Sequence, residues 1–342
     1  DRAAHRPRRT SPLRRYQWDA YLYLVPALIF YVTFLIKPVA DAGWISLFEW
    51  DGLTAAEWTG LDNYLDVVTD PLVWEALTHS FVFIVFYAVL PGALALVFVA
   101  AISRFTVRGL AFYRAALFVP YILSTVVVAI AWRWIFAETG PLNEVLRAVG
   151  LGDVARAWLG DFDTALPAVG VIGAWVMFGL AFVLFISGLQ NIPAELFEAA
   201  RLDGAGPVRE FFAVTLPSLR GEIQVALVLM ITAALRNFDI VWNTTSGGPG
   251  TSTTVPSYYV YREAFVSHHV GRASAIAIVL TIVIFAVVGL VMWLTRDRDA
   301  ATPRSLAGKP AASKRAAIST RAATATSAAA STPAAVSKGA RS

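Results

Sequence analysis

The sequence predicts an all-α integral membrane protein with six transmembrane helices. Hydrophobic residues make up 57% of the 342 residues and charged residues only 15%, whereas a soluble domain carries about 25% charge. Six apolar stretches reach the ~20 residues that a helix needs to cross a hydrocarbon core about 30 Å thick. Basic residues gather in the segments that flank these stretches on one predicted side of the membrane.

The six stretches cover residues 21–40, 80–102, 115–136, 166–189, 223–242 and 275–294. Lys37-Pro38 interrupts the first stretch near its end, and the fifth contains Arg236, Asn237 and Asp239. The first stretch follows basic residues and precedes small ones, as in a cleavable signal peptide. Its apolar run is longer than the roughly 7–15 residues of such a signal, so we expect it to remain as a span.

The distribution of Lys and Arg predicts the orientation, because short cytoplasmic connections are enriched in these residues. Residues 1–20 form a basic arm that contains Arg2, Arg6, Arg8, Arg9, Arg14 and Arg15. The connection 41–79 has carboxylates but neither Lys nor Arg, so we expect it outside, with a lid of short amphipathic helices over residues 50–79. Arg201, Arg209 and Arg220 place loop 190–220 inside. Both termini are then cytoplasmic.

The end of the chain differs in composition from the rest. From residue 298 onward it consists mostly of Ala, Ser, Thr, Pro, Lys and Arg and has no aromatic residue. Such a composition cannot bury an apolar core, so we expect residues 298–342 to be a disordered cytoplasmic tail. The predicted six-helix domain therefore spans residues 21–297.

Composition also excludes several kinds of chemistry. The net charge of +4 does not indicate nucleic-acid binding, because basic residues beside membrane spans are explained by contact with anionic lipid headgroups. With no cysteine, the chain has no disulfide, thiol nucleophile or Cys-ligated metal. No lysine lies in a G-x-x-x-x-G-K-[ST] phosphate loop, so any ATP hydrolysis is expected on another subunit. We expect that His79, His268 and His269 do not form a metal site, because adjacent histidines in an outside loop, such as His268 and His269, are usually solvated.

The polar loop 190–220, between the fourth and fifth stretches, carries the most specific pattern. Pro193 can begin a helix, because its missing N–H would be unpaired there, and residues 194–202 are mostly good helix formers. Glycine tolerates positive φ, so Gly204 permits a reversal before a second short helix over residues 208–214. Glu198-Ala199-Ala200 is followed after three residues by Gly204, and after nine more by Val214, one residue and Leu216-Pro217.

This spacing resembles the EAA loop in the membrane permease subunits of binding-protein-dependent ABC importers of type I. Other segments extend the resemblance: Arg114 to Tyr121, Trp132 to Phe136, Gly188 to Pro193, Ser246 to Gly250, Tyr258 to Phe265 and Ala273 to Ile276. The resemblance covers residues 16–298. The Gly247-Gly248-Pro249 stretch is similar to the larger-permease branch of the maltose type, from which Lys37 departs because an uncharged residue more often precedes the proline there.

The resemblance implies the transmembrane subunit of an ATP-driven carbohydrate importer in the bacterial cytoplasmic (inner) membrane. It implies a second related permease, two ATP-binding-cassette subunits that bind ATP and Mg, and an extracytoplasmic solute-binding protein; this chain itself would hold no cofactor. The loop would couple to the ATPase through Glu195, Glu198, Ala199, Ala200, Asp203, Gly204, Leu216 and Pro217. The alternative for Glu198 is an exposed carboxylate that pairs with Arg201 or with water.

Polar residues within the spans are candidates for a substrate pathway, because an intramembrane ionisable residue costs about 2.5–3.5 kcal/mol on insertion scales. The candidates are Tyr121, Thr125, Trp175, Asn237 and Asp239. Hydroxyls and amides beside a flat aromatic face suit a sugar, and by the resemblance Tyr121, Thr125 and Asn237 line its cavity. Arg236 and Asp239 are three residues apart and could pair on one helical face. The alternative for each candidate is a polar contact between helices.

Two other functions remain open at this point. A stand-alone secondary transporter or channel would show charged relays or broken helices near the midplane, of which Arg236 and Asp239 are a hint. A membrane-embedded transferase that acts on lipid-linked sugars should show an acidic metal-binding pair in a cytoplasmic loop. The clustered carboxylates of loop 190–220 already belong to the EAA pattern. For an importer, a disaccharide, an oligosaccharide and a glycerol phosphate all remain possible solutes.

Overall fold

A computed structural model describes the backbone of residues 16–102 and 108–295, and the side chains of these residues from position 22 onward. Most of the predicted basic arm and the predicted tail, residues 298–342, lie outside the described residues. The described residues all belong to one unit that ends at Thr295.

The first half of the chain forms two long helices, a small hairpin and a bent helix pair. The first long helix joins α1 (Tyr16–Tyr31), the π-helical η2 (Val32–Ile36) and α2 (Lys37–Ile45). The strands β1 (Phe48–Glu49) and β2 (Glu57–Trp58) and helix α3 (Asp62–Thr69) follow. The second long helix joins α4 (Pro71–Ile84), the π-helical η3 (Val85–Val89) and α5 (Leu90–Ile102). Next come α6 (Leu110–Ile122), α7 (Thr125–Ile135), α8 (Pro141–Ala148) and the 3₁₀ turn η4 (Gly152–Val154).

The second half of the chain contains two further long helices with the polar loop between them. The third long helix is α9 (Ala165–Gln190). The loop consists of α10 (Ala194–Leu202), α11 (Pro207–Glu210), the π-helical η5 (Phe211–Thr215) and α12 (Leu216–Ser218). It leads into α13 (Arg220–Leu235), α14 (Asp239–Thr244), α15 (Pro256–Phe265) and the last long helix, α16 (Val270–Thr295).

The described residues contain four helices that are long and apolar enough to cross a membrane: Leu22–Ile45, Pro71–Ile102, Ala165–Gln190 and Val270–Thr295. Two further candidates are bent pairs. The pair α6 and α7 bends by 93°, and the pair Pro207–Ser218 and α13 bends by 69°. Counting each bent pair as one span gives six, the number that the sequence predicts.

The prediction of one continuous helix over residues 115–136 is wrong. Leu123 and Ser124 adopt extended backbone, with ψ of 146° and 127°, between α6 and α7. Pro120 lies inside α6, where its ring clashes with the preceding turn and its missing N–H removes a helical hydrogen bond. The predicted helix over residues 223–242 is also interrupted, because α13 ends at Leu235 and α14 begins at Asp239.

The predicted lid over residues 50–79 is only partly correct. It contains α3 and the start of α4, which Asp70 caps by accepting a hydrogen bond from the Leu72 N–H. The segment before α3, however, is an antiparallel hairpin in which Phe48 faces Trp58 and Glu49 faces Glu57. The Phe48 and Trp58 rings pack edge to face at 5.0 Å, so an aromatic pair stabilises strands too short for a sequence pattern to reveal.

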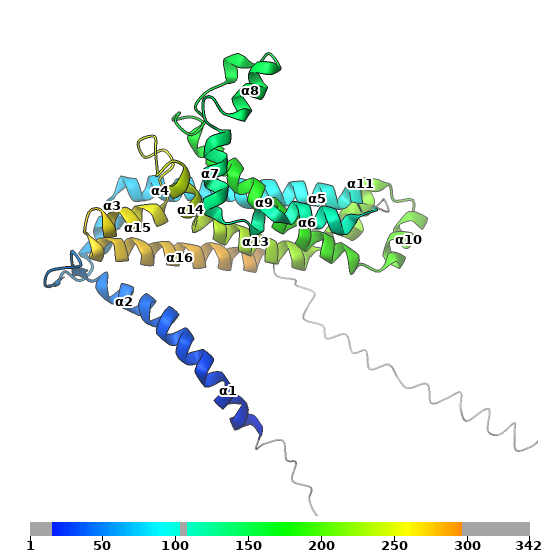
Figure 1. The fold of residues 1–342 in the computed structure, drawn as a ribbon. Coiled ribbons are helices and arrows are strands. Elements are labelled where there is room, and N and C mark those ends of the chain that lie inside the picture. Colours follow the sequence, from blue (N-terminus) through cyan, green and yellow to red (C-terminus); the bar gives the residue numbers. More distant parts are fainter. Residues whose placement is uncertain (1–15, 103–107, 296–342) are drawn as a thin grey trace, which may run out of the picture. The chain divides into compact units, whose positions relative to one another are not determined.

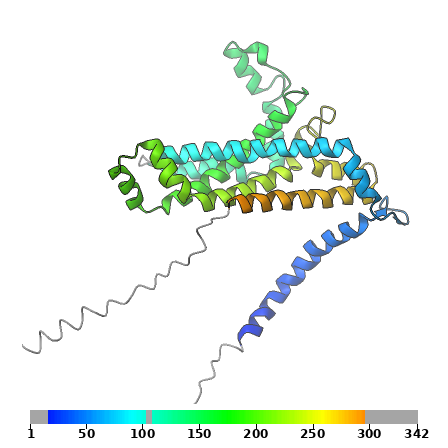
Figure 2. The same ribbon diagram turned by 180° about the vertical axis from the view of Figure 1, so that it is seen from behind.

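The helices α5, α9, α13 and α16 lie lengthwise beside one another, with α10 at one end and α3 and α15 at the opposite end (Figures 1 and 2). Helix α9 is the centre of the packing: 61% of its apolar window is buried, against 0% for the first long helix. A Cβ on Gly173 would lie 1.9 Å from the Tyr87 ring. A glycine at this position therefore lets α9 approach η3 closely.

Candidate functional site

The coupling loop, defined here as residues 190–220, presents α10 on the surface at one end of the bundle (Figure 1). Helix α10 contains no buried residue and contacts α11 and η5. Among the residues predicted to couple, Glu195, Glu198, Ala199, Asp203, Gly204 and Pro217 are exposed, whereas Ala200 and Leu216 are half-buried. The structure thus leaves most of the predicted contact residues accessible to a partner.

The turn after α10 depends on a glycine. Gly204 has a φ of +76°, and a Cβ at this position would meet no atom within 4 Å. The residue is therefore required for its backbone conformation and not for space. The Asp203 N–H donates to Ala199 O at 3.0 Å and the Ala205 N–H donates to Ala200 O at 2.9 Å, so these bonds satisfy carbonyls at the end of the helix.

An ion pair that spacing did not predict links α10 to α11. Arg201 Nε donates to Glu210 Oε2 at 3.0 Å, and Arg201 Nη2 donates to Oε1 at 3.4 Å. The hydrogen bond from Arg201 to Glu210 and the charge of Glu210 raise the pKa of Arg201, and the charge of Glu198 adds a smaller effect. The two residues are nine positions apart across a turn, a separation that the i, i+4 rule for helices does not cover.

Apolar side chains accompany the charges of the coupling loop. Leu202 is 89% exposed, and Leu196, Val208 and Phe212 are also exposed. Exposed apolar groups beside charged ones are typical of a protein interface, where the centre is apolar and the rim is polar. The loop therefore has the chemical character of a docking surface.

The predicted pathway residues lie at the breaks of the two interrupted spans and on α9. Tyr121 is near the end of α6 and Thr125 begins α7. Asn237 lies between α13 and α14, and Asp239 begins α14. Trp175 is on α9, and α14 contacts both α7 and α9. Among the described residues, however, no hydrogen bond or ring contact joins any two of the five. The structure brings their elements together.

Asn237 is the buried member of this group. It is 6% exposed, and its Nδ2 has no hydrogen-bond partner among the described residues. The predicted pairing of Arg236 with Asp239 on one helical face is wrong, because α13 ends at Leu235 and α14 begins only at Asp239, and no ion pair joins the two among the described residues. Backbone breaks within a membrane are tolerated where they are buried in protein or line a cavity.

A separate cavity of about 660 Å³ opens between α7, α8 and α9. Its walls include Trp132, Phe136, Leu142, Trp158 and Val171, and none of the five predicted pathway residues lines it. Because its surface is almost wholly apolar, it offers few partners for sugar hydroxyls. Asn143 holds the adjacent loop in place by donating to Ala137 O, Glu138 O and Arg156 O.

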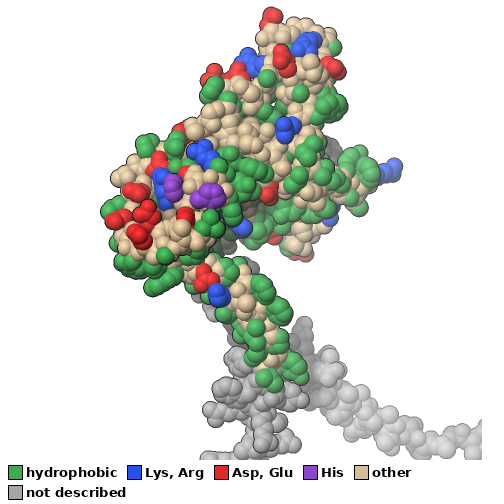
Figure 3. All heavy atoms as spheres, turned by 60° about the vertical axis from the view of Figure 1, so that its left-hand side comes forward, with side chains coloured by type: hydrophobic (Ala, Val, Ile, Leu, Met, Phe, Trp, Pro, Cys, Tyr) green, Lys and Arg blue, Asp and Glu red, His purple; other side chains and the backbone are tan. Residues whose placement is uncertain are grey.

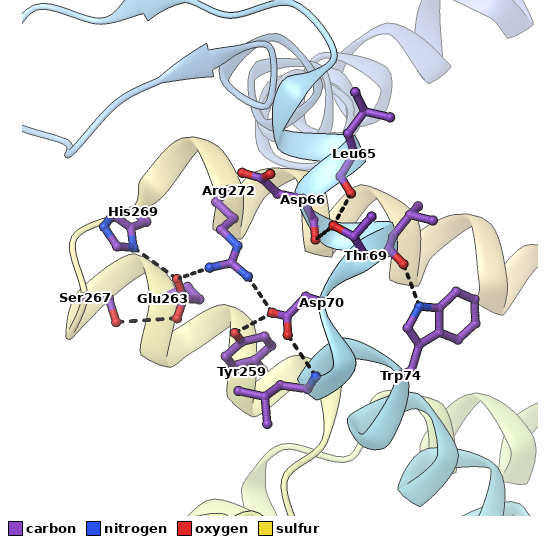
Figure 4. A network of polar contacts seen from close by, with 12 residues as sticks. Leu65, Asp66, Thr69, Asp70, Trp74, Tyr259, Glu263, Ser267, His269 and Arg272 are labelled. Carbon is purple, nitrogen blue, oxygen red and sulfur yellow. Dashed lines mark hydrogen bonds and ion pairs between the residues drawn. The ribbon is translucent and has the colours of Figure 1, made fainter.

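A second polar assembly ties the opposite end of the bundle together (Figure 4). We call it the distal network: Asp70, Tyr259, Glu263, His269 and Arg272. Arg272 donates to Asp70, the Tyr259 hydroxyl donates to Asp70 Oδ2 at 2.8 Å, and Arg272 Nη1 lies 3.7 Å from Glu263 Oε2. His269 Nδ1 lies 3.2 Å from the same oxygen. Asp70 lies at the α3–α4 junction, Tyr259 and Glu263 lie on α15, and His269 and Arg272 lie just before and within the first turn of α16.

Burial, and then the hydrogen bond to Asp70, raise the pKa of Tyr259 to about 12. His268 and His269 are exposed, as predicted for adjacent histidines in a loop, and His269 also contacts Glu263. His79 is half-buried, and its Nδ1 lies 2.8 Å from Thr254 O. Around this network the surface carries exposed carboxylates, including Glu49, Glu57, Asp62 and Asp66, and Figure 3 shows acidic, histidine and basic side chains gathered there. Sequence analysis missed both ion pairs of Arg272 because each joins two different elements: Asp70 and Arg272 are 202 positions apart, and Glu263 and Arg272 lie on the consecutive helices α15 and α16.

Comparison with known protein families shows to which family the chain belongs. A family described as "Binding-protein-dependent transport system inner membrane component" matches residues 23–299. The chain belongs to this family. It is therefore a multi-pass inner-membrane permease component of a binding-protein-dependent system. The membership favours this role over a stand-alone transporter, although the broken helices expected of that alternative are present.

Two relatives and one solved structure agree with this assignment. The chain is 38% identical to the probable ABC transporter permease protein YurN of Bacillus subtilis over 269 residues, which are 78% of this chain and 92% of the relative. It is 33% identical to the diacetylchitobiose uptake system permease protein NgcF of Streptomyces coelicolor over 302 residues, 84% of this chain and 85% of NgcF. A bacterial ABC transporter involved in alginate import shares the fold, with a TM-score of 0.68 and 22% identity over 82% of this chain and 96% of the other.

Proposed function

We propose that this permease imports a carbohydrate that an extracytoplasmic binding protein delivers, and that its coupling loop receives the motion of a separate ATPase subunit. The observation that carries the proposal is the complete EAA spacing on an exposed helix. Support for the carbohydrate comes from the relative NgcF, whose name specifies diacetylchitobiose uptake. The same proposal includes a second related permease and two ATP-binding-cassette subunits, which would hold ATP and Mg.

The orientation follows from the charges in the connections. The coupling loop carries Arg201, Arg209 and Arg220, whereas residues 41–79 contain no Lys or Arg. We place the coupling loop and both termini in the cytoplasm, and α3 and α15 outside. ATP-driven closure of the ATPase subunits would move α10, and this movement would switch the access of a cavity between the two permeases.

The proposed pathway includes the breaks in the two interrupted spans. The Asn237 amide nitrogen has no hydrogen-bond partner among the described residues, and Tyr121 and Trp175 expose aromatic surface. Amide donors beside aromatic faces suit sugar hydroxyls and ring faces. The apolar cavity beside α8 is excluded from the proposed sugar path, because its lining supplies almost no hydrogen-bond partner.

A purification of the tagged, detergent-solubilised chain from its native cells tests the coupling loop. Copurified ATPase is identified by mass spectrometry and by MgATP hydrolysis, for wild type, Glu198→Arg and Gly204→Asp. We expect wild type to recover the ATPase and each variant to recover at least tenfold less of it. Glu144→Arg is the matched control, because Glu144 is an exposed carboxylate on α8. Recovery of no ATPase with wild type, or equal recovery with both loop variants, would contradict the proposal.

A further inference from the structure

The covalent connection between α10 and α11 is a weak mechanical link. It passes through Gly204 and Gly206, and a Cβ at either position would meet nothing within 4 Å. Glycine has the greatest backbone freedom, and among the described residues no atom packs against the place that a Cβ would take at these two positions. The turn therefore absorbs part of any movement of α10, and the rest must pass through the contacts of α10 with α11 and η5.

The ion pair between Arg201 and Glu210 bypasses this turn. Its two hydrogen bonds, at 3.0 and 3.4 Å, fix the orientation of the guanidinium as well as its distance. The Arg201 side chain is 56% exposed, whereas that of Glu210 is 3% exposed. The carboxylate end of the pair is thus held inside the protein and cannot follow Arg201 out of the loop without its surroundings.

Glu210 leads directly toward the transmembrane region. It is the last residue of α11 and is followed by η5 and α12. The segment Pro207–Ser218 then bends into α13, which ends at Leu235, two positions before Asn237. A connected path therefore runs from α10, through the ion pair, to the break between α13 and α14.

We infer that Arg201 and Glu210 are positioning residues that join α10 to η5 and α13 as one unit, so that movement of α10 reaches the break at Asn237. The inference rests on the proposed function, because α10 moves only if an ATPase subunit engages it. The ion pair leaves Glu195 and Glu198 on the exposed surface of α10 for that partner. Docking and transmission are thereby assigned to different residues of one loop.

The test uses the assembled importer in lipid nanodiscs and a thiol reporter of the pathway. Because the chain has no cysteine, Val126→Cys introduces a single thiol on this subunit, at a position that is 42% exposed. Val126 lies on α7, the helix that contacts α14 just after the break at Asn237. The rate at which a maleimide labels this thiol is measured with and without MgATP, and the labelled subunit is identified by mass. MgATP is the only effector added, so the solute is not required.

We expect MgATP to change the labelling rate in the parent. Arg201→Gln and Glu210→Gln should each retain the ATPase subunits and reduce the MgATP-dependent change at least fivefold. In the double variant, the MgATP-dependent change in labelling rate should fall no further than in the more affected single variant, because either change already removes the pair. Arg201→Lys keeps the charge without the planar fork and should give an intermediate response. Arg209→Gln changes an exposed arginine of α11 and should match the parent.

An unchanged response in Arg201→Gln, or a loss in the double variant equal to the product of the single losses, would overturn the inference. If a Gln variant does not assemble, the exchanged variant Arg201→Glu/Glu210→Arg decides: recovery of the response supports the pair, and no recovery overturns it. Absence of an ATPase from the parent complex would overturn the proposed function and the inference together. A bound ATPase whose MgATP leaves parental labelling unchanged would overturn the inference alone.

Discussion

At the α10 end of the bundle, the coupling loop leaves most of its charged side chains exposed. At the α3–α15 end, the carboxylates of the distal network are instead largely buried. Glu195, Glu198 and Asp203 are exposed. By contrast, the side chains of Asp70 and Glu263 are only 12% and 7% exposed, and both contact Arg272. Exposed charges remain available to a partner, whereas buried and paired charges fix the positions of helix ends. The comparison predicts that substitutions in the distal network reduce stability, while substitutions in the coupling loop reduce assembly and transmission.

The largest expected effect is that of Arg272→Met. It leaves the Asp70 and Glu263 carboxylates without their shared cation, and breaking a buried pair on one side costs about 3–5 kcal/mol. Because 26% of the Arg272 side chain is exposed, we expect the lower end, about 3 kcal/mol. Equilibrium unfolding in detergent measures it, with the exposed Arg133→Met as control. If Arg272→Met lowers the free energy of unfolding no more than Arg133→Met does, the distal network does not stabilise its end of the bundle as the comparison predicts.

Tyr259→Phe should have the next largest effect. It removes a hydrogen bond to the Asp70 carboxylate, and bonds to charged groups contribute about 1.5–3 kcal/mol. The same unfolding experiment should show a loss of about 1.5 kcal/mol. The exposed Tyr113→Phe on α6 is the matched control and should change nothing measurable.

Alkaline pH should weaken the distal network through deprotonation of Tyr259. Its phenol has a pKa raised from 10.0 to about 12, so the folded protein binds this proton more tightly than the unfolded chain does. The stabilisation is complete below pH 10 and is lost as the pH rises from 10 to about 12, since the unfolded state releases its proton first. Stability measured across this interval should fall more steeply for wild type than for Tyr259→Phe. Parallel curves would contradict the assignment.

In the coupling loop, Gly204→Ala should act locally. At a φ of +76° an added Cβ costs about 1–2 kcal/mol, whereas Gly206, with a φ of −74°, should accept alanine with little strain. We expect faster amide hydrogen exchange in α10 for Gly204→Ala and no change in the distal network. Equal exchange rates in Gly204→Ala and Gly206→Ala would show that the turn does not depend on the left-handed conformation.

The smallest expected effect lies in the hairpin beside the distal network. Glu49 and Glu57 face each other directly, and like charges at such positions are destabilising by up to about 1 kcal/mol, within the usual range for cross-strand pairs. Glu57→Lys should therefore raise the free energy of unfolding by about 0.5 kcal/mol, and Glu57→Gln by less. A decrease with Glu57→Lys would show that the exposed carboxylates are stabilised by the surrounding structure.

Sequence patterns predicted the long helices well because apolar length is a local property. They placed α9 and α16 within a few residues of their observed bounds, and they identified α10 from its helix formers and the glycine after it. They failed at the bends. Apolar composition continues across Leu123 and Ser124, so nothing in the hydrophobic pattern reveals that the chain turns by 93° there.

The residues of the candidate site show the same difference between local features, which the sequence predicted, and bends of the chain, which it did not. The exposed positions of Glu195, Glu198 and Gly204 agree with the predicted loop, because a short polar helix between two spans has few ways to be buried. Asn237 and Asp239 were predicted inside a span, but they lie where α13 gives way to α14. The pairing of Arg236 with Asp239 required a continuous helix and is absent from the described part of the chain, whereas Arg201 found a partner across the turn.

The sequence by itself determined the membrane class of this protein, the number of its candidate spans and the position of its coupling helix. Each follows from short-range properties: apolar length, helix propensity and the positive φ that Gly204 supplies. Only the tertiary structure decided that Arg201 pairs with Glu210 and that Arg272 joins Asp70 to Glu263. These partners are separated along the chain by turns or whole helices, so their distances depend on how the elements pack and bend.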